Sequence, residues 1–150
     1  MEQIFPFSTP KDHYDFRNEP GCCIVWCSDS RFTPALEQLV RERGYRHYDL
    51  IRIPGGANDL ASTNGENAKY TLQQIALLRR IHNFSQLILM MHQDCAACGG
   101  SPAFGNDYER EVSNLSFTLE SAEMTVKGAI PGLQIEKVLV TFSGVSRVQR

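Results

Sequence analysis

Short apolar runs alternate along the chain with longer segments in which apolar residues recur every three or four positions. The runs lie at residues 22–26, 47–53, 86–91 and 135–142. Their length and largely continuous apolar character predict β-strands that are covered on both faces.

The segments between these runs predict helices. The first is expected between Thr33, which can cap it, and Gly44, which suits its end, with Pro34 in its first turn. The others are expected at residues 67–83 and 107–127, where apolar residues return at helical spacing.

The regular alternation of strand and helix predicts an α/β fold. We expect a parallel sheet of about four strands with helices on both faces. A length of 150 residues suits a single domain over residues 1–150, with residues 1–20 as an irregular N-terminal arm. Ligands of such sheets bind beyond the carboxyl ends of the strands, so the residues after each strand are the candidates for function.

Charge and composition narrow the class of protein. The net charge is −2, which favours neither nucleic acid nor an anionic membrane as a partner. No apolar run approaches the ~20 residues needed to span a bilayer, and we see no secretory leader. The odd count of five cysteines predicts free thiols in a reducing cytoplasm, available for metal binding or catalysis.

Candidate metal ligands follow two of the predicted strands. Cys27 follows the first, and His92 and Cys95 follow the third within the stretch "HQDCAACGG". If these strands are neighbours, the three side chains converge and suit a zinc ion. Three protein ligands leave the fourth tetrahedral position open, unless Cys98 or Asp29 fills it.

Asp29 and Arg31 lie close to the first candidate ligand. If the chain stays extended, residues 27, 29 and 31 point to the same side. Asp29 can then accept a hydrogen bond from metal-bound water, and Arg31 can hold that carboxylate ionised through a bidentate pair. The alternatives are an ordinary salt bridge and a cap at the entry to a helix.

Other interpretations of the same residues stay open. Cys95 and Cys98 have the spacing of a redox pair, although the nearby histidine and Cys27 favour a metal. Gly55 and Gly56 could present backbone N–H groups to a small anion, or simply form a tight turn. Cys22 and Cys23 lie inside a predicted strand and are expected in the core.

The motifs "CSDSR" at residues 27–31 and "HQDC" at residues 92–95 together resemble those of the beta-class carbonic anhydrases. The similarity extends over roughly residues 22–142. It implies that Cys27, His92 and Cys95 bind zinc, that Asp29 and Arg31 activate the bound water, and that zinc-bound hydroxide hydrates carbon dioxide to bicarbonate. It further implies a homodimer or a higher homo-oligomer.

This chain departs from the family pattern at three places. Ala96 follows the last candidate ligand, where family members commonly have glycine. Two adjacent glycines follow Arg52 where family members often carry an Arg-Asn pair and one glycine, and the N-terminal segment is too short for the family's helical arm. These features indicate a short, divergent branch. The alternatives for its function are hydrolysis of carbon disulfide or carbonyl sulfide, and non-catalytic binding of zinc or an anion on the same scaffold.

Overall fold

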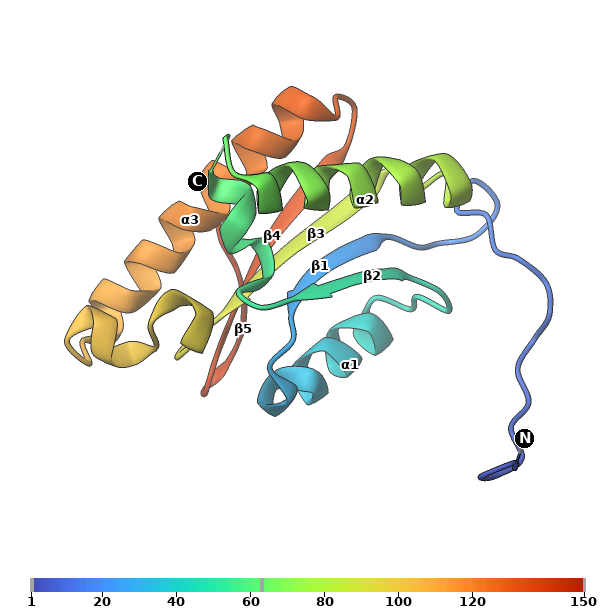
Figure 1. Ribbon diagram of the computed structural model, residues 1–150, viewed down its shortest axis with the longest axis horizontal. Coiled ribbons are helices and arrows are strands. Elements are labelled where there is room, and N and C mark those ends of the chain that lie inside the picture. The colour runs from blue at the N-terminus through green and yellow to red at the C-terminus, as the bar shows by residue number, and fades with distance from the viewer. Residues whose placement is uncertain (1, 63, 150) are drawn as a thin grey trace.

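A computed structural model describes residues 2–62 and 64–149 of the chain. Its five strands are β1 (Cys23–Cys27), β2 (Asp49–Ile53), β3 (Gln86–His92), β4 (Gln134–Thr141) and β5 (Gly144–Arg147). Its α-helices are α1 (Thr33–Glu42), α2 (Glu66–His82) and α3 (Tyr108–Ala129). The strands form one sheet in the order β2-β1-β3-β4-β5, which Figure 1 shows.

The sheet confirms the predicted α/β class. Strands β1 to β4 are parallel to their neighbours, and β1 and β3 lie side by side at the centre. The fifth strand, β5, pairs antiparallel with β4 and was not predicted. It is short, its residues are all exposed, and it lacks the apolar run on which the other strands were recognised.

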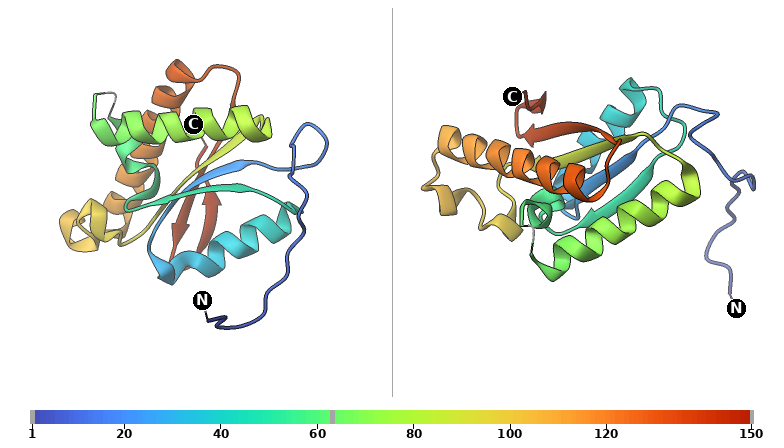
Figure 2. Two further views of the ribbon diagram at one scale, coloured as in Figure 1. Left: turned by 45° about the vertical axis from the view of Figure 1, so that its right-hand side comes forward. Right: turned by 90° about the horizontal axis from the view of Figure 1, so that it is seen from above.

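Helices cover both faces of the sheet, as predicted. Alternate strand residues point to opposite faces and form two separate apolar clusters. One cluster joins the sheet to α2 and α3, and the other joins it to α1. The same arrangement appears from three directions in Figures 1 and 2.

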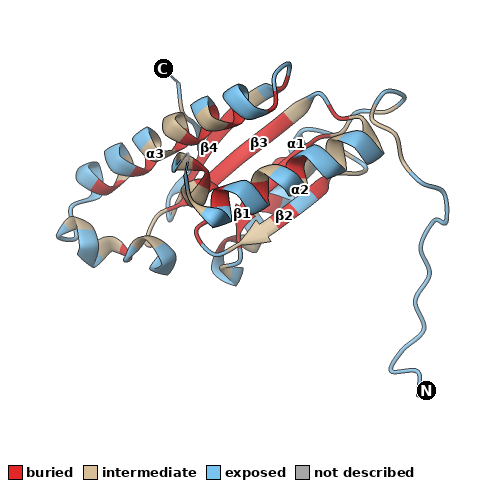
Figure 3. Cartoon of the chain, turned by 45° about the horizontal axis from the view of Figure 1, so that its top comes forward, coloured by how far each residue is buried: buried red, intermediate tan, exposed pale blue. Residues whose placement is uncertain are grey.

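Burial follows this layering, as Figure 3 shows. All five residues of β1 are buried, and so are six of the seven residues of β3. Burial of both strands on both faces is typical of central strands in a parallel sheet and accounts for their continuous apolar sequences. The metal-ligand candidates at the ends of β1 and β3 are therefore carried by the most enclosed part of the fold.

An extended arm precedes β1, and its first part leads away from the body of the molecule (Figure 3). Within the described residues, no helix or strand occurs before Cys23. The arm contacts the body at Tyr14, whose hydroxyl donates to Asp49 Oδ1 at 2.7 Å, and at Phe16, whose N–H donates to the His82 carbonyl at 2.8 Å. Among the described helices, none combines the length and the apolar character that crossing a bilayer requires.

Candidate metal centre

The carboxyl ends of β1 and β3 bring together two thiols and an imidazole. Cys27 is the last residue of β1, His92 is the last residue of β3, and Cys95 follows three residues later. One ligand atom from each of the three lies within 4.8 Å of the others, and the two sulfurs are 3.8 Å apart. All three residues are buried. Neither Cys98 nor Asp29 belongs to this group of mutually close atoms.

The imidazole of His92 is oriented as a metal ligand requires. Its Nδ1 lies 2.7 Å from the carbonyl oxygen of Gln93, so Nδ1–H donates there and Nε2 faces the two sulfurs. Within the described part of the chain, Nε2 is buried without a hydrogen-bond partner. A buried polar atom without a partner is costly, and metal-binding histidines usually donate a hydrogen bond from the other ring nitrogen. The donor set therefore fits a metal ion.

Charge is already separated within this cluster. Hydrogen bonding from the Cys98 thiol lowers the pKa of Cys95 to about 3, although burial acts in the opposite direction, and His92 adds to the lowering. Burial alone would lower the pKa of His92, but the Cys95 and Cys27 sulfurs and the Gln93 carbonyl raise it to about 9. These contacts favour the thiolate form of Cys95, which is the form that binds metals.

Asp29 lies beside the cluster and forms an ion pair with Arg31. Its Oδ2 is 2.6 Å from Arg31 Nη2 and 3.0 Å from Nε, and 4.0 Å from His92 Nε2. Hydrogen bonds from Arg31 lower the pKa of Asp29 to about 2, so the carboxylate is ionised at neutral pH.

The local backbone differs from the extended chain on which the common orientation of residues 27, 29 and 31 depended. Residues Ser30–Phe32 form a short 3₁₀ turn, and Asp29 caps it by accepting a hydrogen bond from the Arg31 N–H at 3.0 Å. The turn is favoured because it satisfies that N–H, and it folds Arg31 back onto Asp29. The ion pair and the helix cap, which were alternatives in the sequence, are both present.

Two charged residues of this region were not recognised from the sequence. Asp94, which lies between His92 and Cys95 in the sequence, accepts a hydrogen bond from Arg31 Nη1 at 3.0 Å. Arg52 donates from Nε to the Cys27 carbonyl at 2.9 Å and from Nη2 to the Asp29 carbonyl at 3.2 Å. An arginine inside the otherwise apolar end of β2 was the available signal for Arg52, because charged side chains in such positions require partners.

The two adjacent glycines hold the backbone close to the cluster. Gly55 and Gly56 have φ values of +83° and +59°, and a Cβ on Gly56 would lie 2.4 Å from the Met90 carbonyl oxygen. The Gly55 N–H points to Cys27 Sγ at 3.4 Å. The geometry thus gives both glycines a role in the tight turn, while anion binding by their N–H groups stays a prediction.

A small hollow opens onto the cluster. Its volume is about 270 Å³, and it is lined by Cys27, Ser28, Asp29, Pro54, Cys95, Ala96 and Ala97. Small and mostly apolar walls, with one ionised carboxylate at the edge, suit a small uncharged substrate better than a large or highly charged one.

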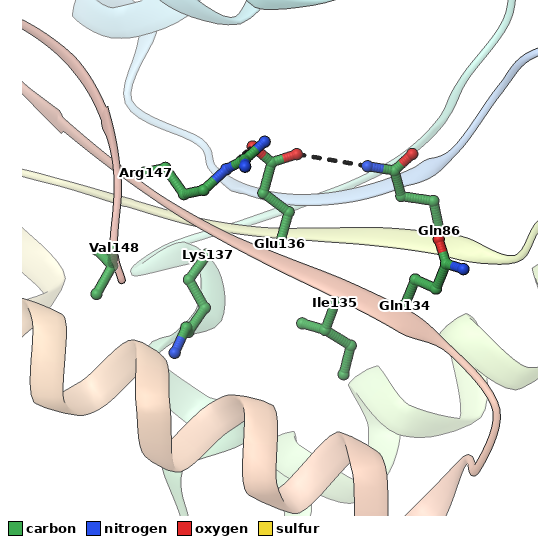
Figure 4. Close-up of a pocket in the computed structure, with 7 residues that line it drawn as sticks. All are labelled: Gln86, Gln134, Ile135, Glu136, Lys137, Arg147 and Val148. Atoms are coloured by element: carbon green, nitrogen blue, oxygen red, sulfur yellow. Dashed lines mark hydrogen bonds and ion pairs between the residues drawn. The ribbon is translucent and has the colours of Figure 1, made fainter. Parts of the chain in front are cut away.

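A second hollow, of about 240 Å³, lies at the opposite end of β4 and contains no thiol or histidine in its lining. Figure 4 shows Glu136 and Lys137 pointing to opposite faces of the strand there. The Glu136 carboxylate is bound by Arg43 and by Arg147, the latter at 2.9 Å. Its charge is therefore already neutralised, and the cluster at Cys27 remains the candidate site.

Together, the mostly parallel sheet, the buried Cys-His-Cys cluster at two strand ends and the adjacent Asp-Arg pair define an α/β protein with a candidate metal centre. Residues 18–145 match the family described as "Putative carbonic anhydrase". The chain belongs to this family, which confirms the resemblance that its two motifs indicated.

The chain is also similar to two further proteins and, in its fold, to one solved structure. An uncharacterized protein of Rickettsia bellii is 24% identical over 148 residues, covering 96% of this chain and 90% of the relative. Another, of Rickettsia conorii, is 22% identical over 152 residues, covering 96% and 80%. A tetrameric beta-carbonic anhydrase of Sordaria macrospora has a similar fold, with a TM-score of 0.56 and 15% identity over 87% of this chain and 81% of that one.

Proposed function

We propose that this protein is a zinc enzyme that catalyses the reversible hydration of carbon dioxide to bicarbonate. The observation that carries the proposal is the buried Nε2 of His92, which has no hydrogen-bond partner among the described residues. It lies beside the sulfurs of Cys27 and Cys95, with an ionised carboxylate 4.0 Å away. Membership of the carbonic anhydrase family supports the same reaction.

Zinc is the metal that these donors favour. Two thiolates and one imidazole are borderline to soft ligands, and three protein ligands are typical of catalytic rather than structural zinc sites. When bound, zinc lowers the pKa of a coordinated water toward ~7 and so supplies hydroxide at neutral pH.

The chain's own groups would orient the reaction. Asp29, which is ionised, would accept a hydrogen bond from the attacking oxygen and so orient that oxygen toward the substrate carbon. Arg31 fixes Asp29 through its bidentate contact. The Gly55 N–H lies 3.4 Å from Cys27 Sγ and would offset part of the negative charge of that sulfur when it binds the metal. The apolar walls of the hollow accept carbon dioxide without competing for hydrogen bonds.

Stopped-flow carbon dioxide hydration by the zinc-loaded protein tests the proposal. We expect rates well above buffer from neutral to alkaline pH. Asp29→Ala should keep its zinc and lose on the order of 10²-fold to 10⁴-fold in rate, because it removes a positioned proton acceptor. Cys95→Ala should lose both zinc and activity.

Asp15→Ala provides the matched control, since Asp15 and Arg17 repeat the Asp-x-Arg geometry on the N-terminal arm, with a 2.6 Å contact. It should leave the rate unchanged. A fully zinc-loaded wild-type protein with no activity above buffer would refute carbon dioxide hydration.

The small apolar hollow also suits carbon disulfide or carbonyl sulfide, which are linear, uncharged analogues of carbon dioxide. Sulfide release by the same zinc-loaded protein tests this second candidate. Non-catalytic zinc binding would instead require a fourth protein ligand that excludes solvent.

We further propose a homodimer or a larger homo-oligomer in the cytoplasm. The Sordaria macrospora protein of similar fold is tetrameric, and the five cysteines, all within the described residues, form no disulfide. Sedimentation of the purified protein tests the association. A monomer at micromolar concentration would refute it.

A further inference from the structure

Arg31 is held by two carboxylates rather than one. Asp29 occupies its Nε and Nη2 side. On the other side, Arg31 Nη1 donates to Asp94 Oδ2 and Nη2 donates to the Asp94 carbonyl oxygen, each at 3.0 Å. Asp94 lies between the ligands His92 and Cys95, so the loop that carries two metal ligands also fixes the arginine.

The backbone of Asp94 is in a conformation that needs support. Its φ is +55°, in the left-handed region that few residues adopt and that Asp and Asn tolerate best. Two contacts hold it there: the Asp94 N–H donates to Glu111 Oε1 at 2.6 Å, and Asp94 Oδ1 accepts from the Ser101 N–H at 2.9 Å. The orientation of Asp94 toward Arg31 is thus set by its neighbours.

Glu111 contacts both Asp94 and Ser101 and so holds the Asp94 backbone in this conformation. It is 1% exposed, in the first turn of α3, and its other carboxylate oxygen accepts from the Ser101 hydroxyl at 2.7 Å. A buried carboxylate is costly unless it is hydrogen-bonded, and a helix N-terminus favours negative charge. A continuous series of contacts therefore connects α3 to Asp29 through Glu111, Asp94 and Arg31.

Asp29 requires such a hold because its Oδ2 is only 4.0 Å from His92 Nε2, and carboxylates are good zinc ligands. The Arg31 side chain is 48% exposed, and an exposed ion pair alone provides little restraint. We propose that Asp94, fixed by Glu111, is a positioning residue that holds Arg31 and so keeps Asp29 beside the metal rather than on it. This inference rests on the proposed function, which needs the fourth metal position free.

The first test uses the metal-free protein and measures hydrogen exchange of the Arg31 Nε–H by NMR. Asp94→Asn keeps the left-handed backbone and the contact from Ser101 but replaces the acceptor facing Arg31. We expect about tenfold faster exchange of this N–H, which donates to Asp29, because loss of the charge-assisted bond from Nη1 to Asp94 lets the guanidinium leave Asp29 more often. Asp15→Asn is the matched control and should leave Arg31 exchange unchanged. Equal exchange in Asp94→Asn and wild type would overturn the proposal.

The second test follows azide binding to the cobalt-substituted protein by visible absorption. Asp94→Asn should weaken azide binding about tenfold, because Asp29 then competes for the fourth position. The double variant D29A/D94N should recover wild-type affinity. Unchanged azide binding in Asp94→Asn, or no recovery in the double variant, would overturn the proposal.

Two substitutions of Glu111 test its role through the same measurement, the azide affinity of the cobalt-substituted protein. Glu111→Gln can still accept from the Asp94 N–H and should bind azide like wild type, whereas Glu111→Ala should resemble Asp94→Asn. If Glu111→Ala folds and binds azide normally, the role of Glu111 is refuted.

The two proposals fail in distinguishable ways. Absence of carbon dioxide hydration together with the expected azide and exchange results would refute the proposed function and leave the positioning role standing. Normal carbon dioxide hydration with unchanged azide binding in Asp94→Asn would refute the positioning role and leave the proposed function standing. Failure of cobalt-loaded wild type to bind azide at all would refute both.

Discussion

At the scale of single residues, the cysteines occupy two chemically different environments. Cys22 and Cys23 are fully buried at the start of β1, and burial raises the pKa of Cys22 to about 12. Cys95, in contrast, has a pKa lowered to about 3 by the Cys98 thiol and His92. The first kind of thiol keeps its proton and packs, while the second loses its proton and is available to a metal.

The raised pKa of Cys22 predicts a loss of stability in alkali. Above pH 9, the ordinary pKa of the thiol, the unfolded chain releases a proton that folded Cys22 keeps until about pH 12. Folded protein then binds more protons than unfolded protein, so the free energy of unfolding falls as pH rises, by about 1.4 kcal/mol per pH unit for one such thiol. Urea unfolding of reduced protein at pH 8 and pH 10 should show that Cys22→Ala has a shallower decline.

Val25→Ala is the control for this experiment, because it truncates another fully buried side chain, within β1, that has no titratable proton. It should lower stability at every pH without changing the slope. Equal slopes for wild type and Cys22→Ala would contradict the prediction.

Residue types and spacing allowed the candidate ligands to be predicted. They did not allow prediction of the carboxylates that hold Arg31 in place. Thiols and imidazole are uncommon side chains, so their placement after two strands is informative. Carboxylates are abundant, and nothing in the sequence distinguishes Glu111 or Asp94 from other acidic residues. The contact between Glu111 and Asp94 depends on where α3 packs against the sheet, which is a property of tertiary structure.

At the scale of elements, the segment after β2 is more ordered than predicted. We predicted no helix or strand between residues 53 and 67, yet Gly56–Ala61 forms a 3₁₀ helix whose Ala57 and Leu60 are buried. A segment this short has too few residues to show a helical period, which is why its pattern resembled a loop. It packs under the ends of the central strands and fixes the tight turn at Gly55 and Gly56.

Substitution at Gly56 should therefore damage the site. Gly56→Ala places a Cβ 2.4 Å from the Met90 carbonyl oxygen and 3.1 Å from the Cys27 N–H nitrogen. We expect a loss of about 3 kcal/mol in the free energy of unfolding, from overpacking and the positive φ together, and weaker zinc retention. Urea unfolding and metal analysis of the purified variant measure the two effects.

Gly44→Ala separates the two causes. Gly44 has φ +69°, but an added Cβ would meet no atom within 4 Å. Gly44→Ala should lower the free energy of unfolding by about 1 kcal/mol, because of the backbone conformation alone. Similar losses for the two variants would show that crowding at Gly56 is unimportant.

At the scale of the whole molecule, the alternation of elements was sufficient to predict a parallel sheet, since parallel neighbours need helical crossovers. The antiparallel edge strand β5 could not be predicted in the same way. It follows β4 through a tight turn and is defined by pairing with β4 rather than by its own sequence. The adjacency of β1 and β3 was an assumption in the sequence and is a fact of the fold.

That adjacency means that a bound metal would tie two central strands together, so its removal should destabilise the whole fold. At metal concentrations about 100 times the dissociation constant, linkage predicts about 2.7 kcal/mol of added stability. Chelation of the zinc-loaded wild type should remove at least this much, measured by urea unfolding. Cys27→Ser should show no dependence on zinc, because it removes the ligand contributed by β1.

Cys98→Ser is the informative comparison, because the serine keeps a hydrogen-bond donor for Cys95 while removing a thiol ligand. If the metal is held by Cys27, His92 and Cys95 alone, this variant should gain as much stability from zinc as wild type does. Loss of the zinc effect in Cys98→Ser would instead identify Cys98 as a fourth ligand, which would close the site. The same comparison thus decides whether Cys98 leaves the fourth position of the metal free.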